Sequence, residues 1–198
     1  MFCLSTRQRV HTIIFKEAGT TDLIDSQTQK TENTMSKTLE NLKEAFAGES
    51  QANRKYLAFA KKADEEGYPQ AARLFRAAAA AETVHAHAHL AVMNGINSTK
   101  QNLQEAMQGE TEEFKEMYPQ MIEEAKVEGN KEAEISFDNA SRVEAIHAGL
   151  YKKMLDNLEK KTDTVYYVCS VCGNTVENEA PDRCPICGAP KSRFMRIE

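Results

Sequence analysis

Apolar residues recur at alternating steps of three and four through four long stretches of the chain, with polar residues between them. This spacing places the apolar side chains on one face of an α-helix. Glycine or proline stands at each break between the stretches, where helices end and begin. Pro119 lies inside the third stretch and should kink that helix or break it locally, because proline removes a backbone donor and clashes with the preceding turn. The pattern predicts helices over residues 38–66, 69–93, 100–128 and 131–160.

Both ends of the chain differ from this helical middle. Residues 1–34 have no sustained period and are rich in Thr, Ser and Gln, which predicts a flexible extension. Basic residues without an acid before Glu17 also give it a weak transit-peptide character. Met35 opens directly onto the first periodic stretch, so we interpret it as the start of the mature protein. Residues 165–198 carry aromatic and β-branched residues between glycines and prolines, which predicts short strands and turns. The predicted helical domain covers 35–161.

Charge and hydropathy exclude two classes of partner. The chain has a formal net charge of −5, and its Lys and Arg residues are spread without a basic block. It therefore offers no surface that would follow nucleic-acid phosphates. No apolar run approaches the roughly 20 residues that a membrane helix needs. We expect a soluble protein that binds neither nucleic acid nor membrane.

Ionisable residues interrupt the inward-facing stripe of each predicted helix near its middle. In three of the helices there are two such residues, three positions apart, so both side chains project from one helix face. The free-energy cost of burying five unpaired carboxylates would exceed the total stability of a typical protein, about 5 to 15 kcal/mol. A cation must therefore lie among them. Carboxylates with a few imidazoles suit iron or manganese at two adjacent positions. The residues are Glu49 in the first helix, Glu82 and His85 in the second, Glu110 and Glu113 in the third, and Glu144 and His147 in the fourth.

This arrangement resembles that of ferritin-like di-iron bundles. The predicted fold is mainly α, a ferritin-like four-helix bundle followed by a small metal-binding domain. A single Glu-x-x-His in a Glu-rich helix is usually a solvated face, but three pairs on three stripes, with a glutamate on the fourth, favour a metal site.

Four further residues of the bundle, two histidines and two tyrosines, stand near the predicted ligands in the sequence. His87 falls off the stripe and is predicted to be exposed. His89 lies on the stripe one turn beyond the predicted ligands, which suits a supporting or core histidine better than a ligand. Tyr56 and Tyr118 stand one to two turns from predicted ligands. They can hydrogen-bond to ligand carboxylates or be ordinary core aromatics.

The C-terminal residues contain two C-x-x-C pairs, formed by Cys169 with Cys172 and by Cys184 with Cys187. Each pair places two sulfurs on one side of a tight turn, and two pairs make a tetrahedral four-sulfur site that holds zinc or iron. Spacing alone does not choose between the two metals. So small a domain needs such a metal in order to fold. Because the thiolates must stay reduced, we expect a reducing, cytoplasmic compartment. Cys3 is interpreted as incidental.

The motifs of both domains together resemble those of the rubrerythrin family, and the C-terminal residues alone are similar to a rubredoxin-type domain. The resemblance covers residues 36–198 and leaves out residues 1–34. The matching motifs are Glu49-Ser50-Gln51-Ala52, Glu82-Thr83-Val84-His85, Gly109-Glu110 to Glu113, Met117-Tyr118-Pro119, Glu144-Ala145-Ile146-His147, and Tyr166 through the four cysteines to Phe194.

The resemblance implies three iron ions per chain equivalent, two in the bundle and one in an Fe(Cys)4 centre. Glu113 and His85 are then expected to exchange at one iron as its redox state changes, and with Tyr56 and Tyr118 they are the expected catalytic residues. The ligands expected in every redox state are Glu49, Glu82, Glu110, Glu144 and His147, with Cys169, Cys172, Cys184 and Cys187 at the third iron.

The function that the resemblance implies is a non-haem di-iron peroxidase in oxidative stress defence. It would reduce hydrogen peroxide to water with electrons delivered through the Fe(Cys)4 centre from an external reductase or rubredoxin, ultimately from NAD(P)H. The chain lacks a Gly-rich dinucleotide fingerprint after a strand, so it should not bind that cofactor itself. The alternatives are a ferritin-like ferroxidase that handles iron, and a non-catalytic bundle with a structural zinc ribbon.

The connection between the second and third predicted helices is short for ferritin-like topology, in which these two helices run parallel. The return from the end of one helix to the start of the next is roughly 27 Å. The linker of residues 94–99 spans only about 20 to 22 Å when straight. An up-down-up-down bundle would avoid this return, as would an exchange of helices between two chains. We expect a domain-swapped homodimer.

Overall fold

The computed structural model describes residues 36–160 and 163–198. The predictions for residues 1–34 and for Cys3 lie outside these residues. The chain divides into two compact units, residues 1–89 and 90–198, and each is described by itself. Among the described residues, no helix combines the length and apolar character needed to cross a bilayer.

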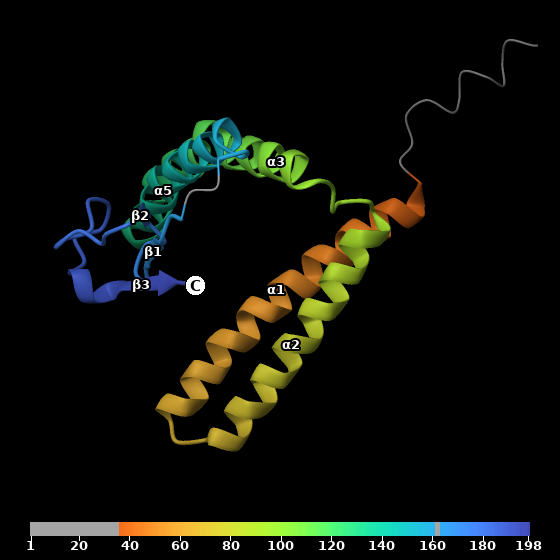
Figure 1. Cartoon of the computed structure of the whole chain (residues 1–198). Helices are drawn as coiled ribbons and strands as arrows, with labels where there is room; N and C mark the ends of the chain where they lie inside the picture. The colour runs from red at the N-terminus through yellow and green to blue at the C-terminus, as the bar shows by residue number, and fades with distance from the viewer. Residues whose placement is uncertain (1–35, 161–162) are drawn as a thin grey trace, which may run out of the picture. The chain divides into compact units, whose positions relative to one another are not determined.

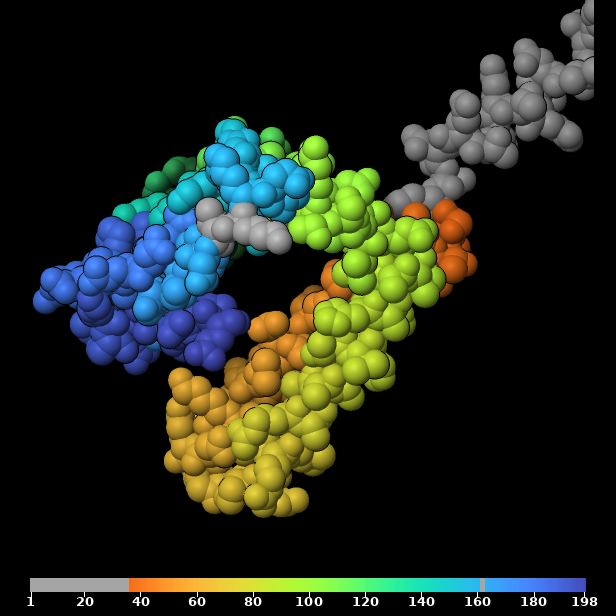
Figure 2. All heavy atoms as spheres, in the orientation of Figure 1, coloured from red at the N-terminus to blue at the C-terminus, as the bar shows by residue number. Residues whose placement is uncertain are grey.

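The N-terminal unit is a hairpin of two antiparallel helices, α1 (Lys37–Glu65) and α2 (Pro69–Val92) (Figure 1). The side-chain oxygen of Ser36 accepts from the backbone N–H of Leu39 and caps the start of α1. Gly67, at φ +79°, makes the turn between the helices in a left-handed conformation that suits glycine. In the space-filling view the atoms of the two helices touch along the hairpin (Figure 2).

Small residues form the seam between the two helices, which lets their backbones approach closely. On α1 the buried residues belong to the predicted stripe, and on α2 they lie one position further along than predicted. The stripe predicted through Glu82 and His85, continued backwards at alternating steps of four and three, passes through Ala78 and Ala71. Five consecutive alanines at 77–81 leave the sequence without a pattern that separates the faces. Glu82 and His85 therefore lie at the edge of the seam. The buried residues are Asn53, Ala60 and Ala63 on α1, and Ala72, Ala79 and Ala86 on α2.

The second unit begins with three consecutive helical segments and a longer helix that packs against them. The predicted break near Pro119 is present as one turn of π-helix. Its wider turn lets the chain continue past Pro119, which then stands in the first turn of α4, where a missing N–H costs little. The segments are α3 (Thr99–Glu112), the π-helix η1 (Glu113–Met117), α4 (Tyr118–Glu128) and α5 (Lys131–Asp156).

The C-terminal residues form a three-stranded antiparallel sheet in the order β2-β1-β3. In register, Tyr166 of β1 pairs with Glu177 on one side and with Ile197 on the other. The cysteine turns extend from this small sheet, and Figure 2 shows its atoms (blue) packed on the second unit's helical part. The elements are β1 (Tyr166–Cys169), β2 (Thr175–Glu177), the 3₁₀ turn η2 (Lys191–Arg193) and β3 (Phe194–Ile197).

Candidate metal centres

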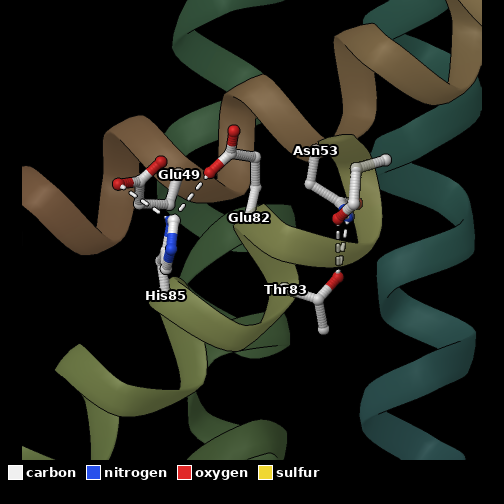
Figure 3. Close-up of polar contacts among 6 residues, drawn as sticks. Glu49, Asn53, Glu82, Thr83 and His85 are labelled. Atoms are coloured by element: carbon white, nitrogen blue, oxygen red, sulfur yellow. Dashed lines mark hydrogen bonds and ion pairs between the residues drawn. The ribbon is translucent and has the colours of Figure 1, made fainter. Parts of the chain in front are cut away.

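The first cluster of predicted ligands joins α1 and α2 (Figure 3). Nδ1 of His85 lies 2.9 Å from Oε2 of Glu82 and 3.8 Å from Oε1 of Glu49. One ligand atom of each residue lies within 4.8 Å of the other two. The side chain of His85 is 54% exposed, so the cluster is open on one side. His87 is exposed, as predicted, and His89 is half-buried one turn beyond His85.

Asn53 sets the register of the two helices at this cluster. Its Nδ2 donates to the carbonyl oxygen of Ala79 at 2.6 Å and to Oγ1 of Thr83 at 2.8 Å (Figure 3). Sliding of one helix along the other would leave this buried amide unpaired, which is costly. Asn53 lies one turn after Glu49, and Thr83 follows Glu82 directly. The hydrogen bonds therefore hold Glu49 opposite Glu82.

The second cluster joins α3 and α5 in the other unit. It consists of Glu110 from α3 and of Glu144 and His147, one turn apart on α5. Nδ1 of His147 lies 2.7 Å from Oε2 of Glu144 and 3.6 Å from Oε1 of Glu110. The three side chains are 17% to 25% exposed. This cluster is more enclosed than the first.

Electrostatics around the second cluster favour a bound cation. Burial, followed by the hydrogen bond and charge of Glu144, raises the pKa of Glu110 to about 7. Burial and then the charge of Glu144 also raise the pKa of Glu113. Burial and then the charge of Glu113 raise the pKa of Tyr118. All three groups resist ionisation, first because they are buried and then because neighbouring carboxylates repel the added charge; a cation among them would favour the ionised forms.

Glu113 lies beside the second cluster and outside its three closest residues. It is half-buried and is the first residue of the π-helix η1. The backbone N–H of Tyr118 donates to the carbonyl oxygen of Glu113 across the wider turn. π turns inside α-helices are frequent at functional sites. Here the π turn places an additional carboxylate within electrostatic reach of Glu144 and His147.

The two predicted tyrosines have aromatic neighbours. The Tyr56 ring centroid lies 6.4 Å from that of Phe59 and 6.4 Å from that of Phe75. The Tyr118 ring centroid lies 6.3 Å from that of Phe137. These contacts match the core-aromatic interpretation of both residues. Tyr118 also lies within electrostatic reach of Glu113, whose charge, after burial, raises the tyrosine pKa.

The four cysteines of the C-terminal sheet form a third candidate centre. Sγ of Cys169 lies 3.8 Å from Sγ of Cys187, and Sγ of Cys172 lies 3.6 Å from Sγ of Cys184. Sulfurs bound tetrahedrally at about 2.3 Å from a metal lie roughly 3.8 Å apart. A disulfide would need about 2.05 Å. The geometry therefore fits a tetrahedral metal ion, and all four thiols are free.

The thiol pKa values differ within this centre. Burial, together with hydrogen bonds to the other thiols, raises the pKa of Cys172 to about 12. Burial also acts on Cys184, but the backbone N–H groups of Cys187 and Ile186 outweigh it and lower the pKa to about 7. A metal ion that binds all four sulfurs must therefore displace protons, including that of Cys172.

Side chains of α5 hold the cysteine sheet against the helical part of the second unit. The Arg142 guanidinium donates to the carbonyl oxygens of Pro185 and Ile186 at 3.1 and 3.3 Å, between the third and fourth cysteines. Further along α5, Lys153 forms an ion pair with Glu177. The sheet is thus held at two points on the helix that also carries two residues of the second cluster.

Models of known protein families match both the helical part of the chain and the cysteine sheet. The rubrerythrin family model matches residues 40–155. The model of the rubredoxin-like domain of rubrerythrin matches residues 167–195. The chain belongs to the rubrerythrin family. It accordingly carries the residues of a rubrerythrin di-iron site, divided between the two clusters, and a rubredoxin-like four-cysteine site.

Several rubrerythrins and nigerythrins are similar over most of their length. Nigerythrin of Nitratidesulfovibrio vulgaris is 39% identical, over 79% of this chain and 85% of that protein. Rubrerythrin-2 of Clostridium acetobutylicum is 36% identical, over 80% of this chain and 95% of that protein. A structure of nigerythrin in a partially reduced state has a TM-score of 0.51 at 37% identity and covers 85% of this chain and 90% of its own. A fully reduced, all-ferrous nigerythrin structure has the same TM-score at 36% identity.

The sequence did not point to the residues that support the clusters. Asn53 stood on the predicted stripe of α1 but with no indication of its partners on α2. Arg142 lies off the stripe of α5 and makes its contacts 43 and 44 residues further along the chain. A buried polar residue inside an apolar stripe is the one signal that could have singled out Asn53.

Proposed function

We propose that this rubrerythrin-family protein is a di-iron peroxidase that reduces hydrogen peroxide to water (H₂O₂ + 2 e⁻ + 2 H⁺ → 2 H₂O). The observation that carries the proposal is the position of Glu113. This carboxylate stands on a π turn beside Glu110, Glu144 and His147. An iron-storage bundle has no need for a second carboxylate at this position of the third helix. A ligand that can bind and leave suits a site whose iron changes redox state.

The donor sets of the two clusters suit hard divalent iron, because each offers two carboxylates and one imidazole. When bound, the iron pair supplies two electrons and the Lewis acidity that orients peroxide. Glu113 and His85 are proposed to exchange at one iron. The side chain of His85 is 54% exposed, so the exchange would not require its ring to move through a packed core. Tyr118, near the charge of Glu113, is proposed to hydrogen-bond to that carboxylate, and Tyr56 is proposed to support Glu49 in the same way.

The four-cysteine site is proposed to hold iron and to receive electrons from an external reductase or rubredoxin, ultimately from NAD(P)H. The support is its attachment to α5, the helix that carries Glu144 and His147. A structural zinc ion would need no such attachment. Free thiols call for a reducing compartment, which we propose to be the cytoplasm. We also propose the domain boundaries 35–161 and 165–198.

The two ligand clusters are proposed to join in a domain-swapped dimer. The stretches of α2 after His85 and of α3 before Glu110 together rise roughly 27 Å. Residues 93–98 between the helices span about 20 to 22 Å when straight. Most of these residues also have a defined turn geometry. Asn94, at φ +55°, ends α2 in a left-handed conformation, and Ser98 opens α3 with a capping box.

The test is a single turnover of the iron-loaded protein. The protein is reduced under anaerobic conditions and mixed with two equivalents of hydrogen peroxide per chain, because each peroxide takes two electrons and each chain would hold three ferrous ions. We expect rapid oxidation of both centres without hydroxyl-radical products. Glu113→Gln should slow this oxidation roughly 10- to 100-fold, as changes around metal ligands typically do. Glu116→Gln, an exposed glutamate on the same π turn, is the matched control.

Three outcomes would contradict parts of the proposal. Slow peroxide reaction with rapid oxygen-dependent mineralisation of added ferrous iron would assign the protein to iron handling. A colourless four-cysteine site that contains zinc after expression in iron-replete cells would remove the electron route. Equal rates for the Glu113 and Glu116 variants would remove Glu113 from the reaction.

A further inference from the structure

A short chain of hydrogen bonds connects His147 of the second cluster with the cysteine sheet. Nε2 of His147 lies 2.9 Å from Oγ1 of Thr175. Oγ1 of Thr175 donates to the carbonyl oxygen of Gly173 at 3.1 Å. Gly173 directly follows Cys172. Through Thr175, the predicted di-iron ligand His147 is therefore connected to the loop that holds the four-cysteine site.

The hydroxyl of Thr175 determines which ring nitrogen of His147 carries the proton. A threonine hydroxyl has one proton, and Thr175 gives it to Gly173. The hydroxyl can therefore only accept from His147, so Nε2 is the protonated nitrogen. Nδ1 then faces the carboxylates, 2.7 Å from Oε2 of Glu144, with which it is hydrogen-bonded, and 3.6 Å from Oε1 of Glu110. A bound metal ion would replace the proton of this hydrogen bond, so the ring is oriented as that of a metal-ligating histidine.

The loop reached by Thr175 is itself tied to the cysteines. The N–H of Gly173 donates to the carbonyl oxygen of Cys169 at 2.9 Å. Nδ2 of the fully buried Asn174 lies 3.6 Å from Sγ of Cys184. Arg142 and Lys153 also contact the sheet, but neither belongs to a cluster of predicted ligands. Among the described residues of the sheet, Thr175 is the one with a hydrogen bond to a predicted di-iron ligand.

We propose that Thr175 is a positioning residue that couples the two metal sites within one chain. It holds the His147 ring with Nδ1 toward the carboxylates, and it completes a hydrogen-bonded route from the loop behind Cys172 to the second cluster. The first part stands on geometry alone, and the second rests on the proposed peroxidase function. Along this route one electron passes from the reduced Fe(Cys)4 centre to the oxidised di-iron site. Two such transfers replace the two electrons that each peroxide takes, and an external one-electron donor resupplies the Fe(Cys)4 centre.

The first measurement concerns the ring of His147 and does not depend on activity. Full-length protein with ¹⁵N-labelled histidine is loaded with zinc, which is diamagnetic, and His147→Gln assigns the signals. We expect a slowly exchanging Nε2–H in the wild type and in Thr175→Ser. In Thr175→Val this proton should exchange rapidly with water, because its acceptor is gone. Thr164→Val, a threonine of the same unit outside the hydrogen-bonded chain, is the control. A slowly exchanging Nε2–H in Thr175→Val would overturn the positioning role.

The second measurement follows the Fe(Cys)4 absorbance after the fully reduced iron protein meets two equivalents of peroxide per chain. We expect Thr175→Val to slow oxidation of the Fe(Cys)4 centre roughly 10- to 100-fold relative to wild type, while Thr175→Ser and Thr164→Val keep the wild-type rate. The reduction potential of the Fe(Cys)4 centre should not change. An unchanged rate in Thr175→Val, or an equal loss in Thr175→Ser, would overturn the route.

Failure of the proposed function gives a different result. In that case the wild-type Fe(Cys)4 centre would not be oxidised by peroxide at all, while the histidine signals would still distinguish Thr175→Val from Thr175→Ser. If Thr175→Val fails to fold, Thr175→Ala takes its place, and the dependence on the hydroxyl is again read from the difference from Thr175→Ser.

Discussion

The carboxyl group of Glu110 is harder to ionise in the second cluster than in an unfolded chain. Its pKa is raised to about 7, first by burial and then by Glu144 and Glu113. Without metal, the folded chain therefore retains a proton on Glu110 that the unfolded chain loses near the ordinary value of 4.5. The protonated Glu110 therefore contributes to the free energy of unfolding below about pH 4.5. This contribution is lost as the pH rises through about 7.

Glu110→Gln should remove this pH-dependent loss in the metal-free protein. Because glutamine cannot ionise, the urea midpoint of the variant should exceed that of the wild type at about pH 8 and approach it near pH 4.5. Urea unfolding followed by circular dichroism at several pH values measures the difference. Glu116→Gln, exposed in the neighbouring π turn, should follow the wild type. A pH-independent difference between Glu110→Gln and the wild type would contradict the assignment.

The helical elements are held in register by a few interhelical contacts. On α1 and α2 the seam consists of small residues that would tolerate sliding, and Asn53 supplies the specific contact. It is 8% exposed, with both acceptors of its amide on α2. In the second unit the π turn has the comparable role of placing Glu113, because it adds a residue to the turn before Pro119.

Asn53→Ala should destabilise the α1–α2 hairpin. Loss of the two hydrogen bonds and of a buried side chain should lower the free energy of unfolding by about 1 to 3 kcal/mol. It should also weaken metal binding at Glu49, Glu82 and His85, because these residues lose their common register. Urea denaturation and ferrous-iron titration measure the two effects. Asn41→Ala, an exposed position on α1, is the control, and equal behaviour of the two variants would contradict the role of Asn53.

At the scale of the whole molecule, the predicted di-iron ligands are divided between the α1–α2 hairpin and the α3–α5 helices, and residues 93–98 connect α2 to α3. Within the described part of the chain, each unit brings three of these ligands into one cluster. In the proposed domain-swapped dimer a complete site would need both clusters, so the length and geometry of the connection would determine which chains supply them. The turn at Asn94 and the cap at Ser98 define the conformation of the connection near its two ends.

Lengthening the connection should change the oligomeric state. The wild type is expected to have twice the mass of one chain by light scattering. About ten Gly/Ser residues inserted after Ile96 would let the connection exceed roughly 27 Å, so we expect monomers that still bind iron. The same insertion after Gly67, in the α1–α2 turn, should leave the dimer intact. A monomeric wild type with a complete di-iron site would contradict domain swapping.

The sequence by itself determined the number of helices, the ligand types and the paired C-x-x-C motif, because these depend on local spacing. A residue three positions after another lies on the same helix face whatever the helix packs against. The break at Pro119 follows from the chemistry of proline and was predicted on the same basis.

Only the tertiary structure decided the features that depend on distant partners. The seam of α2 runs through Ala72, Ala79 and Ala86, one position from the predicted stripe, because the run of alanines has no apolar and polar sides to distinguish. The hydrogen bond from His147 to Thr175 joins residues 28 positions apart, and neither residue indicates the other in the sequence. Periodicity identifies the face of an element, but the partner of that face depends on how the elements pack.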